Sequence, residues 1–210
     1  MNPMVRMPFA ASLMAVLMLF AAPFPSAVAG SGEEEPGAFV ERLVAEVTND
    51  LAGDVDRAER RERFQRMSRR YLALDQITQF ITGAHWSQAT AEEQRAFRKA
   101  FRELLRARFL PVLARADEAR FDVAGSRRVK AGLWQVTLHV RRPGPKTDST
   151  RVGLRVMQTE AGMRVTDVVT RGVSLGVTLR EEYTTFLERH DGDLKALTRR
   201  VRQQARNLEG

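Results

Sequence analysis

Apolar residues recur at helical spacing between residues 90 and 113 of the chain. Steps of three and four residues place one set on a single helical face: Phe97, Phe101, Leu104, Leu105, Phe109 and Val112. Thr90 is followed three residues later by Glu93, the spacing of a capping box, so the helix is expected to begin there. Pro111 lacks a backbone N–H, which predicts that this helix kinks or ends near Arg108.

Similar spacing predicts further helices over residues 38–51, 56–70, 71–86, 175–189 and 193–207. Gly83 is the expected C-cap of the third of these helices. The helix over 56–70 is rich in arginine and has a narrow apolar side. Two interpretations remain open for it: a solvated helical face, or a surface that docks to an anionic membrane or an acidic partner.

The pattern then changes to an alternation with a period of two residues, which is typical of strands with one buried face. Alternating apolar residues occur after Phe121, over 134–140, over 152–156 and over 165–169. Pro143-Gly144-Pro145 and Ala161-Gly162 are the expected turns. The sequence therefore predicts an α+β fold: a single domain with a four-stranded antiparallel curved sheet and helices packed on one face around an apolar pocket.

The apolar faces of this sheet, the long helix and the helix after residue 174 are expected to meet. We expect the following residues to line the pocket: Phe97, Phe101, Leu104, Leu105, Trp134, Val136, Leu138, Leu154, Val156, Leu175, Leu179 and Tyr183. These faces either close into a solid core or leave a cavity where the sheet curves away. The sequence alone does not decide between the two.

The first 29 residues have the pattern of an export signal. Arg6 precedes an apolar run over residues 9–22, and Ala27-Val28-Ala29 has the small-x-small pattern of a cleavage site. The run is too short for an ordinary transmembrane helix. We therefore expect cleavage after Ala29, a flexible tail over 30–37 and a single domain over 38–208, in a soluble exported protein.

Composition narrows the possible functions. The chain has no cysteine, and its three histidines are too scattered to suggest a metal site. The net charge is +8, and removal of the leader, which carries Arg6 and no acidic residue, lowers it to +7. An exported basic protein meets acidic lipid surfaces or acidic proteins rather than nucleic acid, and no nucleic-acid-binding motif is present.

Candidate catalytic groups are few. Ser174 lacks the G-x-S-x-G pattern of a nucleophile elbow, so a helix N-cap is the expected role. Asp167 lies within an apolar strand and is either a shielded general base or, preferably, a hydrogen-bonded carboxylate at a turn or edge. We expect no enzymatic activity, no metal and no cofactor.

Three stretches together resemble the MlaC family, also called the toluene-tolerance family. The first comprises Leu72, Leu74, Ile77, Gly83 and Trp86. The second comprises Ala89, Thr90, Gln94, Arg95, Phe97, Phe101, Arg102, Glu103, Leu104 and Leu105. The third comprises Gly172, Val173, Ser174, Leu175, Arg180, Glu182, Tyr183, Gly192, Asp193 and Leu194. Their order and spacing agree with the family over nearly the whole mature chain.

This resemblance implies that residues 38–208 form a single lipid-binding domain of a monomeric periplasmic carrier, with phospholipid bound as cargo in a deep apolar pocket. It also implies exchange of lipid with an inner-membrane ABC transporter complex and an outer-membrane lipoprotein complex, and so a role in the lipid asymmetry of the outer membrane. The sequence leaves open a hopanoid cargo, as in a hopanoid-associated branch of the family. The alternative function is a periplasmic adaptor with a closed core, whose basic helix binds a protein. An enzyme with Asp167 as base ranks last.

Overall fold

The computed structural model of the chain describes residues 34–142 and 149–209. The expected signal peptide, the start of the expected tail and the Pro143-Gly144-Pro145 turn lie outside the described residues. The helices of the described part are α1 (Pro36–Leu51), α2 (Arg57–Tyr71), α3 (Leu74–Thr82), α4 (His85–Gln88), α5 (Ala91–Leu113), the short 3-10 helix η1 (Ala116–Glu118), α6 (Leu175–Glu188) and α7 (Leu194–Glu209).

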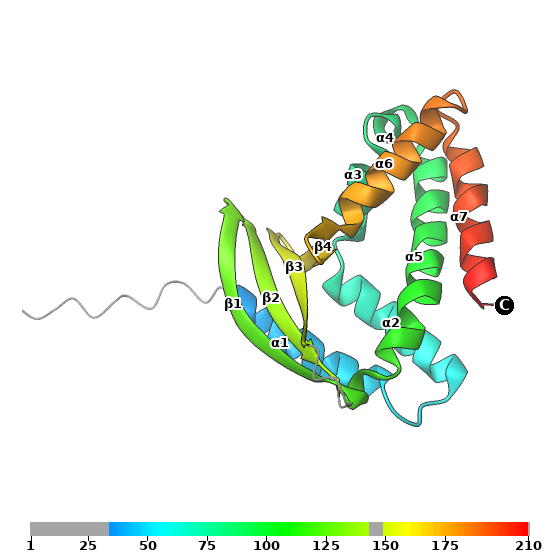
Figure 1. The fold of residues 1–210 in the computed structure, drawn as a ribbon. Coiled ribbons are helices and arrows are strands. Elements are labelled where there is room, and N and C mark those ends of the chain that lie inside the picture. Colours follow the sequence, from blue (N-terminus) through cyan, green and yellow to red (C-terminus); the bar gives the residue numbers. More distant parts are fainter. Residues whose placement is uncertain (1–33, 143–148, 210) are drawn as a thin grey trace, which may run out of the picture. The chain divides into compact units, whose positions relative to one another are not determined.

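The strands form one antiparallel sheet in which each strand neighbours the next along the chain (Figure 1). They are β1 (Arg120–Lys130), β2 (Leu133–Arg141), β3 (Ser149–Thr159), β4 (Gly162–Thr170) and β5 (Val173–Ser174). The predicted α+β single domain is confirmed, but the predicted number of four strands is wrong. The fifth strand has only two residues, too few to produce an alternating pattern in the sequence.

Strand register brings the predicted inward residues of the sheet together. Trp134 lies opposite Val156, and Val136 lies opposite Leu154. Val136 and Val156 are fully buried. The intervening residues of β2 and β3 point to the other face, as the two-residue period of a strand requires. β1 is the edge strand and is mostly exposed, with arginine and lysine along its second half, which discourages pairing with another sheet.

Helix α1 lies along the sheet, where it contacts β1 and β2 (Figure 1). Phe39 and Val40 of this helix are fully buried. The helix begins at Pro36, two residues earlier than expected, because proline is well suited to the first turn, where its missing N–H is not needed. Pro36 and Gly37 are therefore part of the helix and not of a tail.

Helix α5 runs beside α7 and also contacts α1, α2 and α3 (Figure 1). Its predicted capping box is confirmed: the Thr90 hydroxyl accepts the Glu93 N–H, and the Glu93 carboxylate accepts the Thr90 N–H. Of the two outcomes predicted for Pro111, a kink or an end of the helix near Arg108, the end is wrong. The helix continues to Leu113 because the proline lies in the last turn, where only one backbone bond is lost.

The segment 71–86, predicted as one helix, forms two. Gly83 ends α3 with a positive φ of 60°, and its N–H bonds to the Gln79 carbonyl, so the predicted C-cap is confirmed. Before α3, the Ala73 N–H bonds to the carbonyl of Val165 in β4. This bond ties residues 72–73 to the sheet and keeps them out of the helix.

Candidate functional site

The twelve residues predicted to line a pocket fall into two groups in the structure. Five lie on the buried face of the sheet: Trp134, Val136, Leu138, Leu154 and Val156. Seven lie on α5 and α6: Phe97, Phe101, Leu104, Leu105, Leu175, Leu179 and Tyr183. Except for Trp134 and Leu175, which are partly buried, all are buried.

Much of the helical group forms a closed aromatic core. The Phe97 ring lies 6.3 Å from Trp86, 6.1 Å from Phe101 and 6.2 Å from Tyr183, measured between ring centroids. Phe97 and Tyr183 are fully buried. Such clusters stabilise a fold through apolar burial and edge-to-face geometry. Phe97 and Tyr183 therefore belong to the packing between α4, α5 and α6.

The helix that packs most directly on β1 and β2 is α1 rather than α5. α1 was not among the elements predicted to line the pocket, although Phe39, Leu43 and Val47 recur there at four-residue spacing. That periodicity predicts a helix and its apolar face, but it carries no information about which element the face will meet. Leu43, Val44 and Val47 are partly buried against the core.

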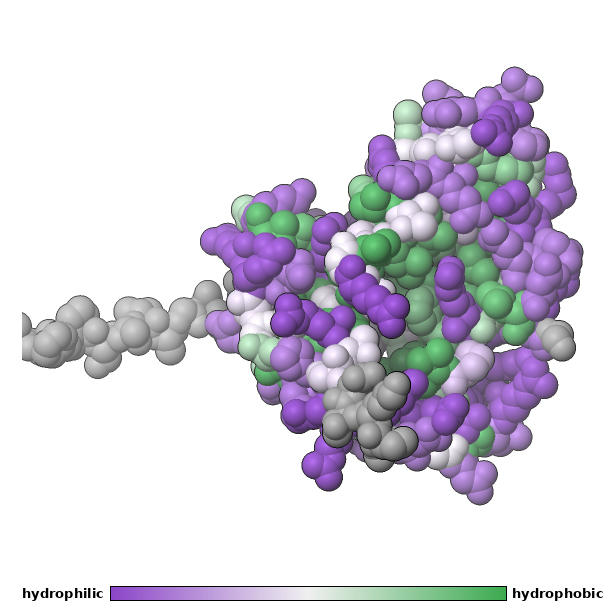
Figure 2. Space-filling view, viewed as in Figure 1, coloured by the Kyte–Doolittle hydropathy of each residue, from purple (hydrophilic) through white to green (hydrophobic). Residues whose placement is uncertain are grey.

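Apolar side chains gather in a recess between the strands and α5 (Figure 2). Several apolar side chains that pack against the core are only partly buried: Leu43, Val44, Val47, Phe109, Leu113, Val152 and Val168. A surface of this kind can hold an apolar chain through burial alone, without directional polar contacts. Two further hollows, of about 390 and 200 Å³, lie along α2 and α5 and are lined by none of the twelve predicted residues.

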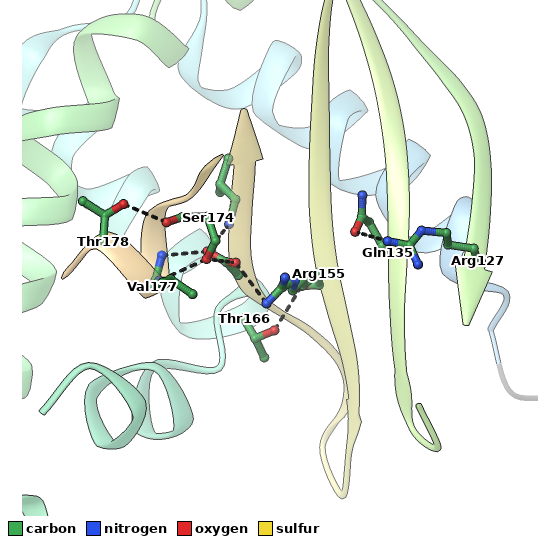
Figure 3. Close-up of polar contacts among 10 residues, drawn as sticks. Arg127, Gln135, Arg155, Thr166, Ser174, Val177 and Thr178 are labelled. Atoms are coloured by element: carbon green, nitrogen blue, oxygen red, sulfur yellow. Dashed lines mark hydrogen bonds and ion pairs between the residues drawn. The ribbon is translucent and has the colours of Figure 1, made fainter. Parts of the chain in front are cut away.

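Ser174 lies between the sheet and the start of α6 (Figure 3), and Asp167 of β4 contacts both it and the helix. The Ser174 hydroxyl donates to Asp167 Oδ2 at 2.6 Å, and the same hydroxyl oxygen accepts the Val177 N–H at 3.0 Å. Asp167 Oδ1 accepts the N–H of Gly176 at 2.8 Å. Arg155 Nη1 lies 3.5 Å from Asp167 Oδ2.

These contacts give both polar residues structural roles. The prediction that Ser174 is a helix N-cap is confirmed. The Asp167 side chain is 7% exposed, and it accepts hydrogen bonds from the sheet and from α6. A carboxylate held by several donors fixes the helix start. The preferred interpretation of Asp167 as a hydrogen-bonded carboxylate agrees with this geometry.

Two buried tyrosine hydroxyls have no hydrogen-bond partner within the described residues. Burial raises the pKa of Tyr183 above its ordinary value. Burial also raises the pKa of Tyr71, and nearby Glu46 adds to the shift. Both phenols therefore stay protonated in the folded chain to higher pH than in the unfolded one.

Neither a membrane span nor a metal cluster is found in the part of the chain that the structure describes. Across residues 34–142 and 149–209, no helix combines the length and apolarity needed to cross a bilayer. The same residues contain no group of three or more histidine or carboxylate side chains placed to hold a metal ion.

Residues 38–203 match the sequence profile of the MlaC protein. This match covers most of the chain, so the chain belongs to the MlaC family. The family consists of periplasmic lipid-binding carriers and not of enzymes, which confirms that part of the prediction. The comparisons give no support to a hopanoid-associated branch.

The fold is also that of a phospholipid-binding protein from Ralstonia solanacearum, solved in complex with a phospholipid. The two structures superpose with a TM-score of 0.70 over 84% of this chain and 100% of that one, at 19% sequence identity. At this identity the likeness establishes a shared fold. No curated protein matches the chain.

Proposed function

We propose that this protein is a periplasmic carrier that binds the acyl chains of a phospholipid in the apolar recess between the sheet and the helices. It shuttles the lipid, as a monomer, between an inner-membrane ABC transporter complex and an outer-membrane lipoprotein complex. The observation that carries the proposal is the apolar recess between the strands and α5 (Figure 2), together with the partly buried apolar side chains of α1, α5 and the sheet. The phospholipid held by the Ralstonia protein of the same fold supports it.

The energetics suit such a task. Burying a methylene is worth about 0.8 kcal/mol, so two acyl chains of roughly 30 methylenes gain on the order of 24 kcal/mol relative to water. A bilayer offers a similar gain, so the carrier has only to match the membrane for exchange to be possible. The site therefore needs a shape that fits acyl chains and excludes water, rather than reactive groups.

Within the proposed site, the sheet residues Trp134, Val136, Leu138, Leu154 and Val156 form one wall. Leu104 and Leu105 face it from α5, and Leu43 and Val47 of α1 extend the lining. The aromatic core around Phe97 and Tyr183, with Leu179 and Leu175, supports the helical side from behind.

Leu154→Trp tests this proposal, because Leu154 lies at the centre of the sheet's buried face, between Val136 and Val168. If the neighbouring space holds acyl chains, the larger ring fills it, and the variant loses lipid while its melting temperature changes little. If the space is a solid core, the ring overpacks it and costs about 1–3 kcal/mol. Thr137→Trp, on the opposite face of β2, is the matched control.

Both measurements are made on one preparation: thermal melting, and analysis of the lipid extracted from protein purified without detergent. We expect lipid to be extracted from the wild type and from Thr137→Trp. Leu154→Trp should be folded but contain little lipid. A lipid-free wild type together with a strongly destabilised Leu154→Trp would favour the closed-core adaptor.

A further inference from the structure

A basic groove runs along α2 and α5 and reaches the end of α7. It consists of the two hollows of about 390 and 200 Å³, which share Arg106. The cations that line it are Arg57, Arg60, Arg61, Lys99, Arg102 and Arg106, and the acids are Glu103 and Glu209. The larger hollow falls within the range of about 300–1,000 Å³ that is usual for binding sites.

The positive charges of this groove are incompletely neutralised. Arg106 pairs with Glu209 at 2.6 Å. The other five cations take part in no ion pair within residues 34–142 and 149–209; Arg60 donates only to the carbonyl of Gly53. Five cations that line the groove are thus left without an ion-pair partner in the described residues. An anionic group entering the groove would relieve that repulsion.

Buried donors point to the same conclusion. The Nε–H groups of Arg60, Arg102 and Arg106 are buried and have no hydrogen-bond partner within the described part of the chain. Burial, followed by the charge of Arg69, lowers the pKa of the Arg102 guanidinium. Holding a guanidinium where its charge is disfavoured costs stability, which is characteristic of binding sites rather than of scaffold.

The bottom of the groove is apolar. Ala107, Leu110 and Pro111 of α5 and Ala114, which follows it, line the larger hollow together with Leu208 of α7, which is 52% exposed. The ligand must therefore present apolar and acidic groups side by side. The outer layer of a bilayer consists of polar head groups, and the acyl chains below them lie too deep to reach a recessed apolar surface. A protein segment, in contrast, carries apolar and acidic side chains at the same depth.

We propose that this α2–α5–α7 groove is a docking site for an acidic, amphipathic segment of a partner protein. Its carboxylates pair with Arg57, Arg61, Lys99 and Arg102, and its apolar side chains cover Leu110 and Leu208. Planar guanidinium groups bind carboxylates through paired hydrogen bonds, which favours arginine at such a surface. The groove contains none of the residues proposed to bind lipid, so the inference holds whether or not the protein carries lipid.

The test uses the mature protein and a fluorescent helical peptide of about 15 residues with glutamate on one face and leucine on the other. Binding is followed by fluorescence anisotropy at low and at physiological salt. The groove variant is Arg61→Gln/Arg102→Gln. The control variant is Arg151→Gln/Arg189→Gln, which removes the same charge from exposed positions elsewhere. A second peptide replaces leucine by glutamine.

We expect the peptide to bind to the wild type. The groove variant should bind the peptide about ten-fold more weakly than the control variant does. The groove variant should melt no lower than the wild type, because it removes crowded like charges. Leu208→Ser should weaken binding of the leucine peptide but not of the glutamine peptide. Equal binding by groove and control variants would overturn the proposal.

Vesicles of phosphatidylglycerol and phosphatidylcholine distinguish a membrane from a protein partner. We expect the vesicles not to displace the bound peptide. If vesicles bind more tightly than the peptide and lose that binding in the groove variant, the surface recognises membrane and the proposal is wrong.

Discussion

The rings of Phe97 and Tyr183 meet edge to face, with their centroids 6.2 Å apart. Both side chains are fully buried, and they join α5 to α6. This contact places the two residues in the packing of the helices. A residue in such a core should matter for folding before it matters for any ligand.

Phe97→Ala should therefore lower the free energy of unfolding by about 3–5 kcal/mol, because it opens a large cavity among Trp86, Phe101 and Tyr183. Phe80→Ala is the control, since Phe80 is among the exposed apolar residues and should cost much less. Chemical denaturation monitored by circular dichroism measures both. Equal, small effects would mean that the space around Phe97 is not tightly packed.

Alkaline titration should show that neither tyrosine ionises in the folded state near its ordinary pKa of about 10. The chain has two tyrosines, and the pKa of each is raised in the fold. Because the folded state keeps protons that the unfolded chain releases, stability should fall as pH rises above about 10. Phenolate absorbance should then appear together with loss of structure.

Tyr183→Phe should flatten that alkaline decline and leave stability at neutral pH equal or slightly higher, because the hydroxyl has no hydrogen-bond partner within the described residues. The same melts, repeated from neutral to alkaline pH, provide the comparison. Reversible phenolate formation in a fully folded protein near pH 10 would contradict the burial of both rings.

Asp167→Ala should destabilise the protein by about 1–3 kcal/mol, since it leaves the Gly176 N–H and the Ser174 hydroxyl without their acceptor. Gly176→Ala should also destabilise it, because the added Cβ would lie 3.2 Å from Asp167 Oδ1, which the N–H groups of Val168 and Gly176 hold in place. Asp54→Ala, at an exposed position between α1 and α2, is the control for loss of a carboxylate. Unchanged unfolding curves for the first two variants would show that this link does not hold α6.

The periplasmic form should begin at Gly30, because Ala27-Val28-Ala29 supplies the small-x-small pattern after the apolar run. N-terminal sequencing of the exported protein checks the position. Retention of Met1 in a membrane fraction would instead indicate an uncleaved anchor.

Local signals in the sequence were sufficient for most elements. The Thr90–Glu93 capping box, the Gly83 C-cap and the two-residue alternation of β2 and β3 each depend on neighbouring residues, so they could be recognised without the fold. β5 could not, because two residues carry no period.

Relations between distant segments were harder to predict. The α1 periodicity predicted a helix, but not that it would cover β1 and β2. Likewise, the arginines of 56–70 suggested a charged face, but the groove forms only where α2 meets Arg102 and Arg106 of α5 and Leu208 of α7. Such sites depend on packing between elements, which periodicity does not encode.

Native mass spectrometry of the mature protein, purified without detergent, tests the central claim of lipid carriage most directly. We expect a main species heavier than the polypeptide by the mass of one phospholipid, which dissociates on activation to leave the folded chain. A spectrum containing only the polypeptide mass, from protein freshly isolated from cells, would contradict it.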